Sequence, residues 1–249
     1  MTRRWLVLVL TIACYFHNIS PAGAGEIASR LAAFPRWSVP TNLLTNGELI
    51  YPAWFAGEWQ VTSILKEQIA PLAPQIVTPG FDRNKTNIDR PYQFRVRFGS
   101  ETTTVAPGIS MSKDATNQVL ADRAFNGQQI AAAYLGDKAV ESIEVIKKPQ
   151  IKQITKLASG TQLTVVMTGY QKETSPQRLM TTELNQQIFQ GKTIYLNTVE
   201  TTTSYQLLAD GHITAQQVTA IYLSPQDPDY FRALQQPVAL YRYALNLTK

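Results

Sequence analysis

The feature that most constrains the fold of this chain is an alternation of apolar and polar residues that recurs in segment after segment. In YQFRVRF, residues 92–98, aromatic and aliphatic side chains occupy every second position, and Gln93, Arg95 and Arg97 occupy the positions between them. Successive side chains of a β-strand point to opposite faces of its sheet. The segment therefore predicts a half-buried antiparallel strand whose arginines face solvent.

Further segments of this kind follow at short intervals, separated by residues that favour turns. The expected strands span residues 141–147, 151–157, 162–170, 179–184, 193–208, 213–223 and 238–247. Asp210-Gly211 falls between two of them and predicts a hairpin, because both residue types tolerate a positive φ. Ser159-Gly160 lies in the same way between two earlier strands. A meander of consecutive hairpins is the simplest topology.

Two segments interrupt this pattern. Pro71, Pro74 and Pro79 predict a long loop over residues 70–80, because proline lacks the donor that a central strand needs. The one clear helical region is an insertion at about 115–136, which Gly127 divides into two short helices. Gly127 and Gly136 each suit a left-handed helix end.

Seven to nine strands in hairpin order leave two free edges, and closure into a barrel removes them. We therefore expect a mainly β fold, an antiparallel barrel with a short helical insertion. The interior of a barrel of about eight strands holds either one small ligand or its own side chains. The sequence leaves both alternatives open.

The first 24 residues are expected to be a cleaved export signal. Arg3 and Arg4 precede an apolar run at 5–13, and Ala22-Gly23-Ala24 supplies small residues before a cleavage site. The apolar run is shorter than the roughly 20 residues that cross a bilayer, so we expect no transmembrane segment in the mature chain. The twin arginines fit both general secretory and twin-arginine export. The mature protein is then a single barrel domain, residues 25–249.

Composition excludes several classes of function. The chain has 23 basic and 18 acidic residues, and removal of residues 1–24 takes away Arg3 and Arg4 and no acidic residue. We therefore expect no nucleic-acid partner. The one cysteine, Cys14, lies in the export signal, and His212 is the only histidine after it. These counts predict no metal site and no cofactor, and leave an enzyme possible but not favoured.

The segment FAGEW, residues 55–59, resembles the Gly-x-Trp signature that begins the first strand of lipocalins and related calycins. The resemblance implies a calycin/lipocalin-like barrel. It also implies that an arginine of the last strand packs over the tryptophan, and Arg242 is the matching residue. Gly57, Trp59 and Arg242 are thus expected to form a structural plug of the barrel.

Four longer segments resemble an uncharacterised family, a domain of unknown function, that occurs in cyanobacteria and plant chloroplasts. They are YPAWFAGEWQVTS, ADRAFNGQQIAAAYLG, VETTTSYQLL and TAIYLSPQDPDYF with the later PVALYRY. The resemblance implies export to a thylakoid lumen or periplasm and a photosynthetic setting. It implies no activity.

Candidate ligand-binding residues fall into three groups. Arg123 beside Phe125 could hold an anionic group at a barrel mouth, or belong to an exposed helix face. Glu200 could face the interior with the hydroxyls of Thr198 and Thr202, or form an outward polar edge. Aromatic residues of the strands and the helical region could line a cavity or fill a core: Tyr92, Phe94, Tyr134, Tyr195, Tyr205, Tyr222, Tyr241 and Tyr243.

Two functions follow as hypotheses. The first is an exported, soluble, calycin-like protein that binds a small apolar or pigment-like ligand inside the barrel. The alternative is an assembly or interaction factor for thylakoid membrane complexes, which uses its outer surface and needs no ligand. An acid-base site formed by Asp122, Arg123 and Glu200 is a third possibility. The volume of the barrel interior and the side chains that point into it distinguish the first two hypotheses.

Overall fold

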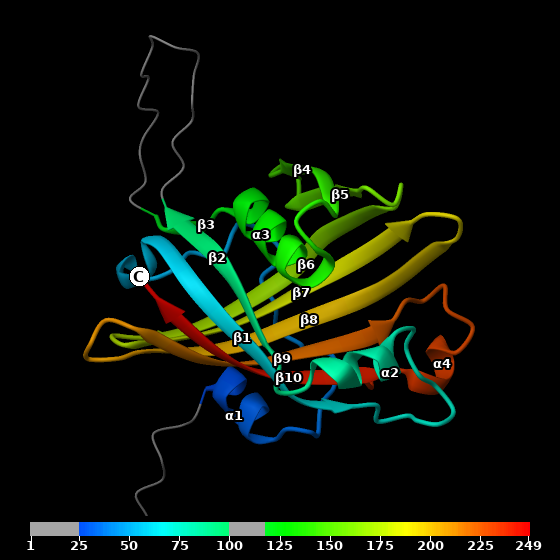
Figure 1. Cartoon of the computed structure of the whole chain (residues 1–249). Coiled ribbons are helices and arrows are strands. Elements are labelled where there is room, and N and C mark those ends of the chain that lie inside the picture. The colour runs from blue at the N-terminus through cyan, green and yellow to red at the C-terminus, as the bar shows by residue number, and fades with distance from the viewer. Residues whose placement is uncertain (1–24, 100–117) are drawn as a thin grey trace, which may run out of the picture.

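The computed structural model describes residues 25–99 and 118–249 (Figure 1). The expected export signal, 1–24, and the first part of the expected helical insertion, 115–117, lie outside these ranges. Within them, ten antiparallel strands form one curled sheet in the order β3-β2-β1-β10-β9-β8-β7-β6-β5-β4. The strands are β1 (Gly57–Ile69), β2 (Pro91–Gly99), β3 (Leu120–Ala121), β4 (Val140–Ile146), β5 (Lys152–Leu157), β6 (Gln162–Ser175), β7 (Arg178–Gln190), β8 (Ile194–Leu207), β9 (Ile213–Leu223) and β10 (Ala239–Thr248).

The helices are short and lie around this sheet. They are α1 (Glu26–Ala32), α2 (Phe81–Asn84), α3 (Arg123–Leu135) and α4 (Tyr230–Ala233), with the 3-10 turns η1 (Ala53–Phe55) and η2 (Lys85–Asn87). No helix in the described ranges is long and apolar enough to cross a membrane.

The strands follow one another as the alternation pattern predicts. From β4 to β10 each strand pairs with the next, and the predicted turns at Ser159-Gly160 and Asp210-Gly211 join β5 to β6 and β8 to β9. β7 is longer than expected, because residues 185–190 continue to pair with both β6 and β8. The last strand then pairs with the first, from Gln60 opposite Thr248 to Ile69 opposite Leu240. The sheet therefore curls back on itself, as a calycin-like barrel does.

The barrel is not closed by strand pairing all the way round. Its two edge strands are β3 and β4, which follow each other in the sequence and are joined by α3. α3 lies across the gap and packs against β2 on one side and β4 on the other (Figure 1). We call this gap the seam. Farther along it, Leu44 forms a single bridge to Tyr170, and Tyr51 forms one to Val119.

The structure corrects the expected division of the helical region. α3 runs unbroken through Gly127 and ends at Gly136, whose φ is +99°. A Cβ at Gly127 would lie 2.7 Å from Gln153 Nε2 and 3.2 Å from Ile143 Cδ1. The glycine therefore serves close packing of α3 on β4 and β5 rather than a helix end.

The two faces of the sheet have different covers. Residues of the inner face include Trp59, Val61 and Leu65, all buried in the barrel. The outer face of β8, β9 and β10 is covered by the N-terminal segment, residues 25–40, in which Trp37 packs on Val218, Ala220, Tyr222 and Leu240. Figure 1 shows α1 on this outer side, opposite α3.

Candidate functional site: the barrel interior

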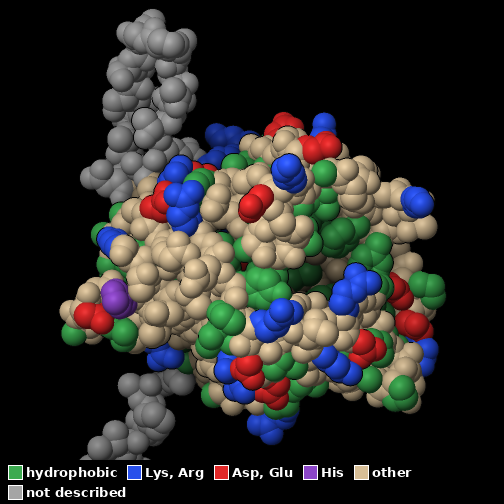
Figure 2. All heavy atoms as spheres, viewed as in Figure 1, with side chains coloured by type: hydrophobic (Ala, Val, Ile, Leu, Met, Phe, Trp, Pro, Cys, Tyr) green, Lys and Arg blue, Asp and Glu red, His purple; other side chains and the backbone are tan. Residues whose placement is uncertain are grey.

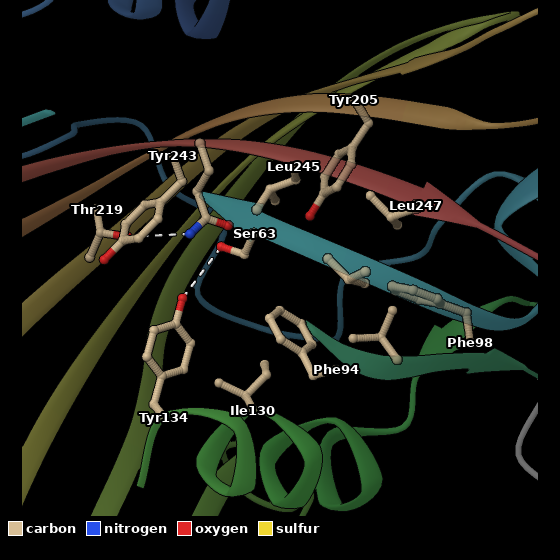
Figure 3. Close-up of a pocket in the computed structure, with 13 residues that line it drawn as sticks. Ser63, Phe94, Phe98, Ile130, Tyr134, Tyr205, Thr219, Tyr243, Leu245 and Leu247 are labelled. Atoms are coloured by element: carbon tan, nitrogen blue, oxygen red, sulfur yellow. Dashed lines mark hydrogen bonds between the residues drawn. The ribbon is translucent and has the colours of Figure 1, made fainter. Parts of the chain in front are cut away.

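The inner face of the barrel encloses a cavity of about 290 Å³. Its walls come from β1, β2, β8, β9, β10 and the seam helix α3 (Figure 3). The lining residues are Val61, Ser63, Phe94, Val96, Phe98, Ile130, Tyr134, Tyr205, Gln217, Thr219, Tyr243, Leu245 and Leu247. The alternation in β2 that predicts an apolar face thus forms one wall of the cavity, and Arg95 and Arg97 point to the outer side, where both are about half exposed.

The cavity has a polar end and an apolar end. At the polar end the Ser63 Oγ lies 3.4 Å from the Tyr134 hydroxyl, and Gln217 Nε2 donates a hydrogen bond of 3.4 Å to Thr219 Oγ1. The Tyr243 hydroxyl lies near them and makes no hydrogen bond with any described residue (Figure 3). At the apolar end the walls are Val61, Val96, Phe98 and Leu247. A molecule in the cavity would meet these two environments at its two ends.

The walls of the cavity carry no net charge at neutral pH. Among the described residues that line it there is no Lys, Arg, Asp or Glu. Burial raises the pKa of Tyr205 to about 12 and raises the pKa values of Tyr243 and Tyr134 above their ordinary value. The three phenols therefore remain protonated and can donate hydrogen bonds.

An aromatic cluster closes the apolar end. Trp59 is buried and its Nε1 donates a 2.7 Å hydrogen bond to the Phe55 carbonyl. Phe55 in turn packs edge-on against Tyr205, with ring centroids 5.0 Å apart. Gly57 has a φ of +113°, a conformation that favours glycine, and lets the chain turn from η1 into β1.

The expected role of Arg242 is wrong. The cation over the Trp59 ring is Lys249, whose Nζ lies 4.7 Å from the ring centroid. Arg242 points to the outer face of β10, where its guanidinium lies 5.1 Å from the Phe34 ring centroid and pairs with Glu67. Residues of β10 alternate between faces, and Arg242 shares the face of Leu240 while Trp59 lies on the other.

Arg123 and Phe125 do not come together as expected. The Arg123 guanidinium turns toward the inside of the barrel and lies 2.9 Å from Glu183 Oε1 and 3.4 Å from Glu48 Oε1. The Phe125 ring lies on the other side of α3, with the Arg97 guanidinium 3.9 Å from its centroid. Two carboxylates already compensate the charge of Arg123, so it offers no free cation to an anionic ligand.

Glu200 and Tyr222 lie on the outer face rather than in the cavity. Glu200 is fully buried beneath the N-terminal segment. Its carboxylate accepts hydrogen bonds from Arg30 Nη2 at 2.8 Å, Trp37 Nε1 at 3.0 Å, the Tyr222 hydroxyl at 2.6 Å and the Thr202 hydroxyl at 2.6 Å. Burial, with the adjacent carboxylate, raises the pKa of Tyr222. We call these five residues the Glu200 cluster.

The remaining tyrosines divide between the cavity and the rest of the barrel. Tyr134 and Tyr205 line the cavity, and Tyr134 stacks on Tyr92 with ring centroids 4.3 Å apart. Tyr195 does not line it: its hydroxyl lies 3.4 Å from Thr78 Oγ1. The polar residues Ser63, Gln217 and Thr219 were not expected at the site. Because residues 59, 61 and 63 alternate along one strand, the sequence alone could have placed Ser63 on the same face of the sheet as Trp59.

No acid-base or metal constellation forms in the described parts of the chain. Asp122 caps α3 by accepting a 3.1 Å hydrogen bond from the Phe125 amide, Arg123 pairs inside the barrel, and Glu200 lies on the outer face. The three residues therefore do not share a cleft. In the same described parts, no three His, Cys, Asp or Glu side chains gather in an arrangement that could hold a metal ion.

Comparison with protein families gives one match. Residues 44–249 match the domain of unknown function DUF6816. The chain belongs to this family. No curated protein and no solved structure matches the chain. The family description names no activity, so function must be argued from the site, and the cyanobacterial or thylakoid setting stays a prediction.

Proposed function

We propose that this DUF6816 protein binds a small, largely apolar molecule in the interior of its barrel. The observation that carries the proposal is the cavity of about 290 Å³, walled by aromatic and aliphatic side chains with a few polar groups at one end. Ligand sites are typically concave, mostly apolar and about 300–1,000 Å³ in volume, with a small number of polar groups that fix orientation. The cavity lies just below that range, which suits a small ligand.

The way the barrel is packed supports the proposal. Protein interiors are close-packed, with few voids larger than a water molecule. Here Phe94, Phe98, Tyr134, Tyr205 and Tyr243 line the cavity without filling it, and Phe55 and Trp59 pack together beyond its apolar end. An apolar ligand in the cavity would make dispersion contacts with these walls.

The cavity also has an access route. Ile130 and Tyr134 line it and are nevertheless 40% and 39% exposed. Both are in the C-terminal half of α3, so the opening lies beside this half of the seam helix. Figure 2 shows the surface hollowed below α3, with hydrophobic side chains around the hollow.

Filling the cavity tests the proposal. Leu245 lines the cavity, and its neighbour Ala244 points to the outer face and is exposed. We expect saturable binding of the fluorescent apolar probe N-phenyl-1-naphthylamine to the wild-type protein. Leu245→Trp should lower its affinity by about tenfold or more, because the new side chain occupies the ligand's volume. Ala244→Trp should leave the affinity unchanged.

The outcome is read from fluorescence titrations at matched protein concentrations. Circular dichroism melting curves confirm that both variants are folded. Equal binding by Leu245→Trp and the wild type would place the probe outside the barrel and contradict the proposal. So would a wild-type protein that binds no apolar probe.

We also propose that the protein acts after export, in a thylakoid lumen or periplasm, with a pigment-like or other apolar ligand. The pattern of residues 1–24 and the resemblance to lumenal proteins support this. N-terminal sequencing of the protein from the soluble exported fraction should begin at Gly25. Recovery only as a full-length chain in the cytoplasm would contradict it.

A further inference from the structure

The cavity's chemistry narrows the class of ligand. We propose that the ligand is an uncharged molecule with an apolar body and one hydrogen-bonding head, a hydroxyl or a carbonyl. Its body lies against Val61, Phe98 and Leu247, and its head lies at Ser63, Gln217 and Tyr243. This inference rests on the proposed function.

The absence of a charge partner excludes ionic ligands. A buried carboxylate or ammonium group is costly unless an opposite charge pairs with it. None of the described lining residues carries a charge at neutral pH. Two arginines near the barrel have partners of their own: Arg123 pairs with Glu183 and Glu48, and Arg242, on the outer face, pairs with Glu67.

Lys249 also lies outside the cavity, over the far end of the aromatic cluster. Its ammonium is 4.7 Å from the Trp59 ring, and Trp59 is not one of the lining residues. An acidic head in the cavity would therefore gain no ion pair from the walls to offset the part of its hydration that it gives up. A molecule with the same body and an uncharged head would not have to desolvate a charge.

The polar end, by contrast, has hydrogen-bonding capacity that the protein itself does not use fully. The Tyr243 hydroxyl has no partner among the described residues. The contacts from Ser63 to Tyr134 and from Gln217 to Thr219 are both 3.4 Å, longer than the usual 2.5–3.2 Å. A hydroxyl that lines a cavity and has no protein partner can bond to one more polar atom, so this group of side chains is suited to the head of a ligand.

The apolar end cannot accept such a head. Val61, Val96, Phe98 and Leu247 present only carbon atoms to the cavity. Beyond this end, Trp59 Nε1 is already bonded, since it donates to the Phe55 carbonyl at 2.7 Å. The Tyr205 hydroxyl points into the cavity from the side between the two ends (Figure 3). The arrangement therefore fixes the direction in which the ligand lies.

Three compounds that share one ring system test the inference: naphthalene, 2-naphthol and 2-naphthoate. Each is used at pH 7 to displace bound N-phenyl-1-naphthylamine, so that they differ in the head alone. We expect 2-naphthol to compete about fivefold better than naphthalene, which is the gain from one hydrogen bond. We expect 2-naphthoate to compete worse than naphthalene, because its carboxylate must be desolvated.

A double variant locates the head. Ser63→Ala with Tyr243→Phe should remove the advantage of 2-naphthol over naphthalene and leave naphthalene competition within about twofold. Thr62→Ala is the matched control, because Thr62 neighbours Ser63 on the opposite face of β1 and should leave the preference unchanged.

The outcomes separate this inference from the proposed function. If 2-naphthoate competes as well as 2-naphthol, or the hydroxyl preference survives in the double variant, the neutral-head inference is overturned while binding in the barrel stands. If the reporter probe itself does not bind the wild-type protein, both are overturned. Both the neutral-head inference and the proposed function are supported if 2-naphthol competes best and 2-naphthoate worst, and if only the double variant loses the preference for 2-naphthol.

Discussion

The two faces of strand β8 show polar groups in opposite conditions. On the outer face, Glu200 accepts hydrogen bonds from four side chains of its own cluster, and the shortest bond from each of them is 2.6–3.0 Å long. On the inner face, Tyr205 faces a cavity whose polar contacts are 3.4 Å long and where the Tyr243 hydroxyl has no described partner. Polar groups that the chain satisfies itself hold the fold together. Polar groups that it leaves incomplete are available to another molecule.

Removal of the Glu200 carboxylate should have the largest effect on stability. Glu200→Ala leaves Arg30, Trp37 Nε1 and the Tyr222 hydroxyl without their acceptor beneath the N-terminal segment. Loss of one partner from a buried ion pair costs about 3–5 kcal/mol. We therefore expect a loss of this size in the free energy of unfolding, measured by urea denaturation.

Glu58 provides the control for this variant. It pairs with Arg95 and Arg97 on the exposed side of β1 and β2. Exposed ion pairs contribute less than about 1 kcal/mol, so Glu58→Ala should be mild. At a temperature where Glu200→Ala is folded, its affinity for the apolar probe should equal that of the wild type. Equal losses of unfolding free energy in the two variants would show that the Glu200 cluster stabilises the fold no more than an exposed ion pair does.

Two tyrosine-to-phenylalanine substitutions, each of which removes one hydroxyl group, compare the outer and inner faces directly. Tyr222→Phe removes a 2.6 Å hydrogen bond to the buried carboxylate of Glu200. Hydrogen bonds to charged groups contribute about 1.5–3 kcal/mol, and the unfolding free energy should fall by this amount. Tyr243→Phe removes a hydroxyl without a described partner and should change stability by less than about 0.5 kcal/mol.

The same pair should behave in the opposite way in ligand binding. Tyr243→Phe should lower the affinity for 2-naphthol, whereas Tyr222→Phe should leave this affinity unchanged. Urea titrations give the stabilities and probe displacement gives the affinities. A larger stability loss in Tyr243→Phe than in Tyr222→Phe would contradict the view that the outer-face hydroxyl stabilises the fold and the inner-face hydroxyl does not.

The last expected effect appears only in alkaline solution and is a pH dependence that arises from Tyr205. Burial raises its pKa from 10.0 in the unfolded chain to about 12 in the fold. The unfolded state therefore loses the phenol proton first. The stabilisation is complete below pH 10 and is lost as the pH rises toward 12.

This effect can be isolated by comparison with Tyr205→Phe. The wild-type unfolding free energy should fall more steeply than that of the variant between pH 10 and 12, and the two should run parallel from pH 6 to 9. Urea titrations across this range provide the measurement. Parallel curves above pH 10 would mean that Tyr205 is solvated in the fold.

Much of the fold follows from the sequence, and the reason is visible in individual strands. The alternation in 92–98 and the turns at Ser159-Gly160 and Asp210-Gly211 predict strands and their pairing, because each depends on nearby residues only. The pairing of the last strand with the one that begins near Trp59 also agrees with expectation. In each case the local preference and the global fold point the same way.

The face to which Glu200 points was not predictable. Residues 197–204, NTVETTTS, are polar on both alternating faces, so their pattern lacks the contrast that distinguishes inside from outside. The partners of Arg123 were hidden for another reason. Glu48 and Glu183 are 75 and 60 residues away in the sequence, and only the closed barrel brings them together.

The Arg242 assignment, by contrast, was open to correction from the sequence. In LYRYALNL, residues 240–247, Tyr241, Tyr243, Leu245 and Leu247 form the apolar alternate set, which marks the inner face. Arg242 belongs to the other set and cannot reach a tryptophan on the inner face. The resemblance supplied a residue type and a strand, but the position has to obey the alternation.

The seam has a mechanical consequence. Ladder hydrogen bonds run without interruption from β3 round the sheet to β4, and α3 spans the remaining sector. The sector under the C-terminal half of this helix can therefore dilate while every strand pair stays intact. Such a movement breaks side-chain contacts such as the stacking of Tyr134 on Tyr92, and it breaks no hydrogen bond between strands. In the proposed function, a ligand would then enter by displacement of one helix, and no strand pair would have to open.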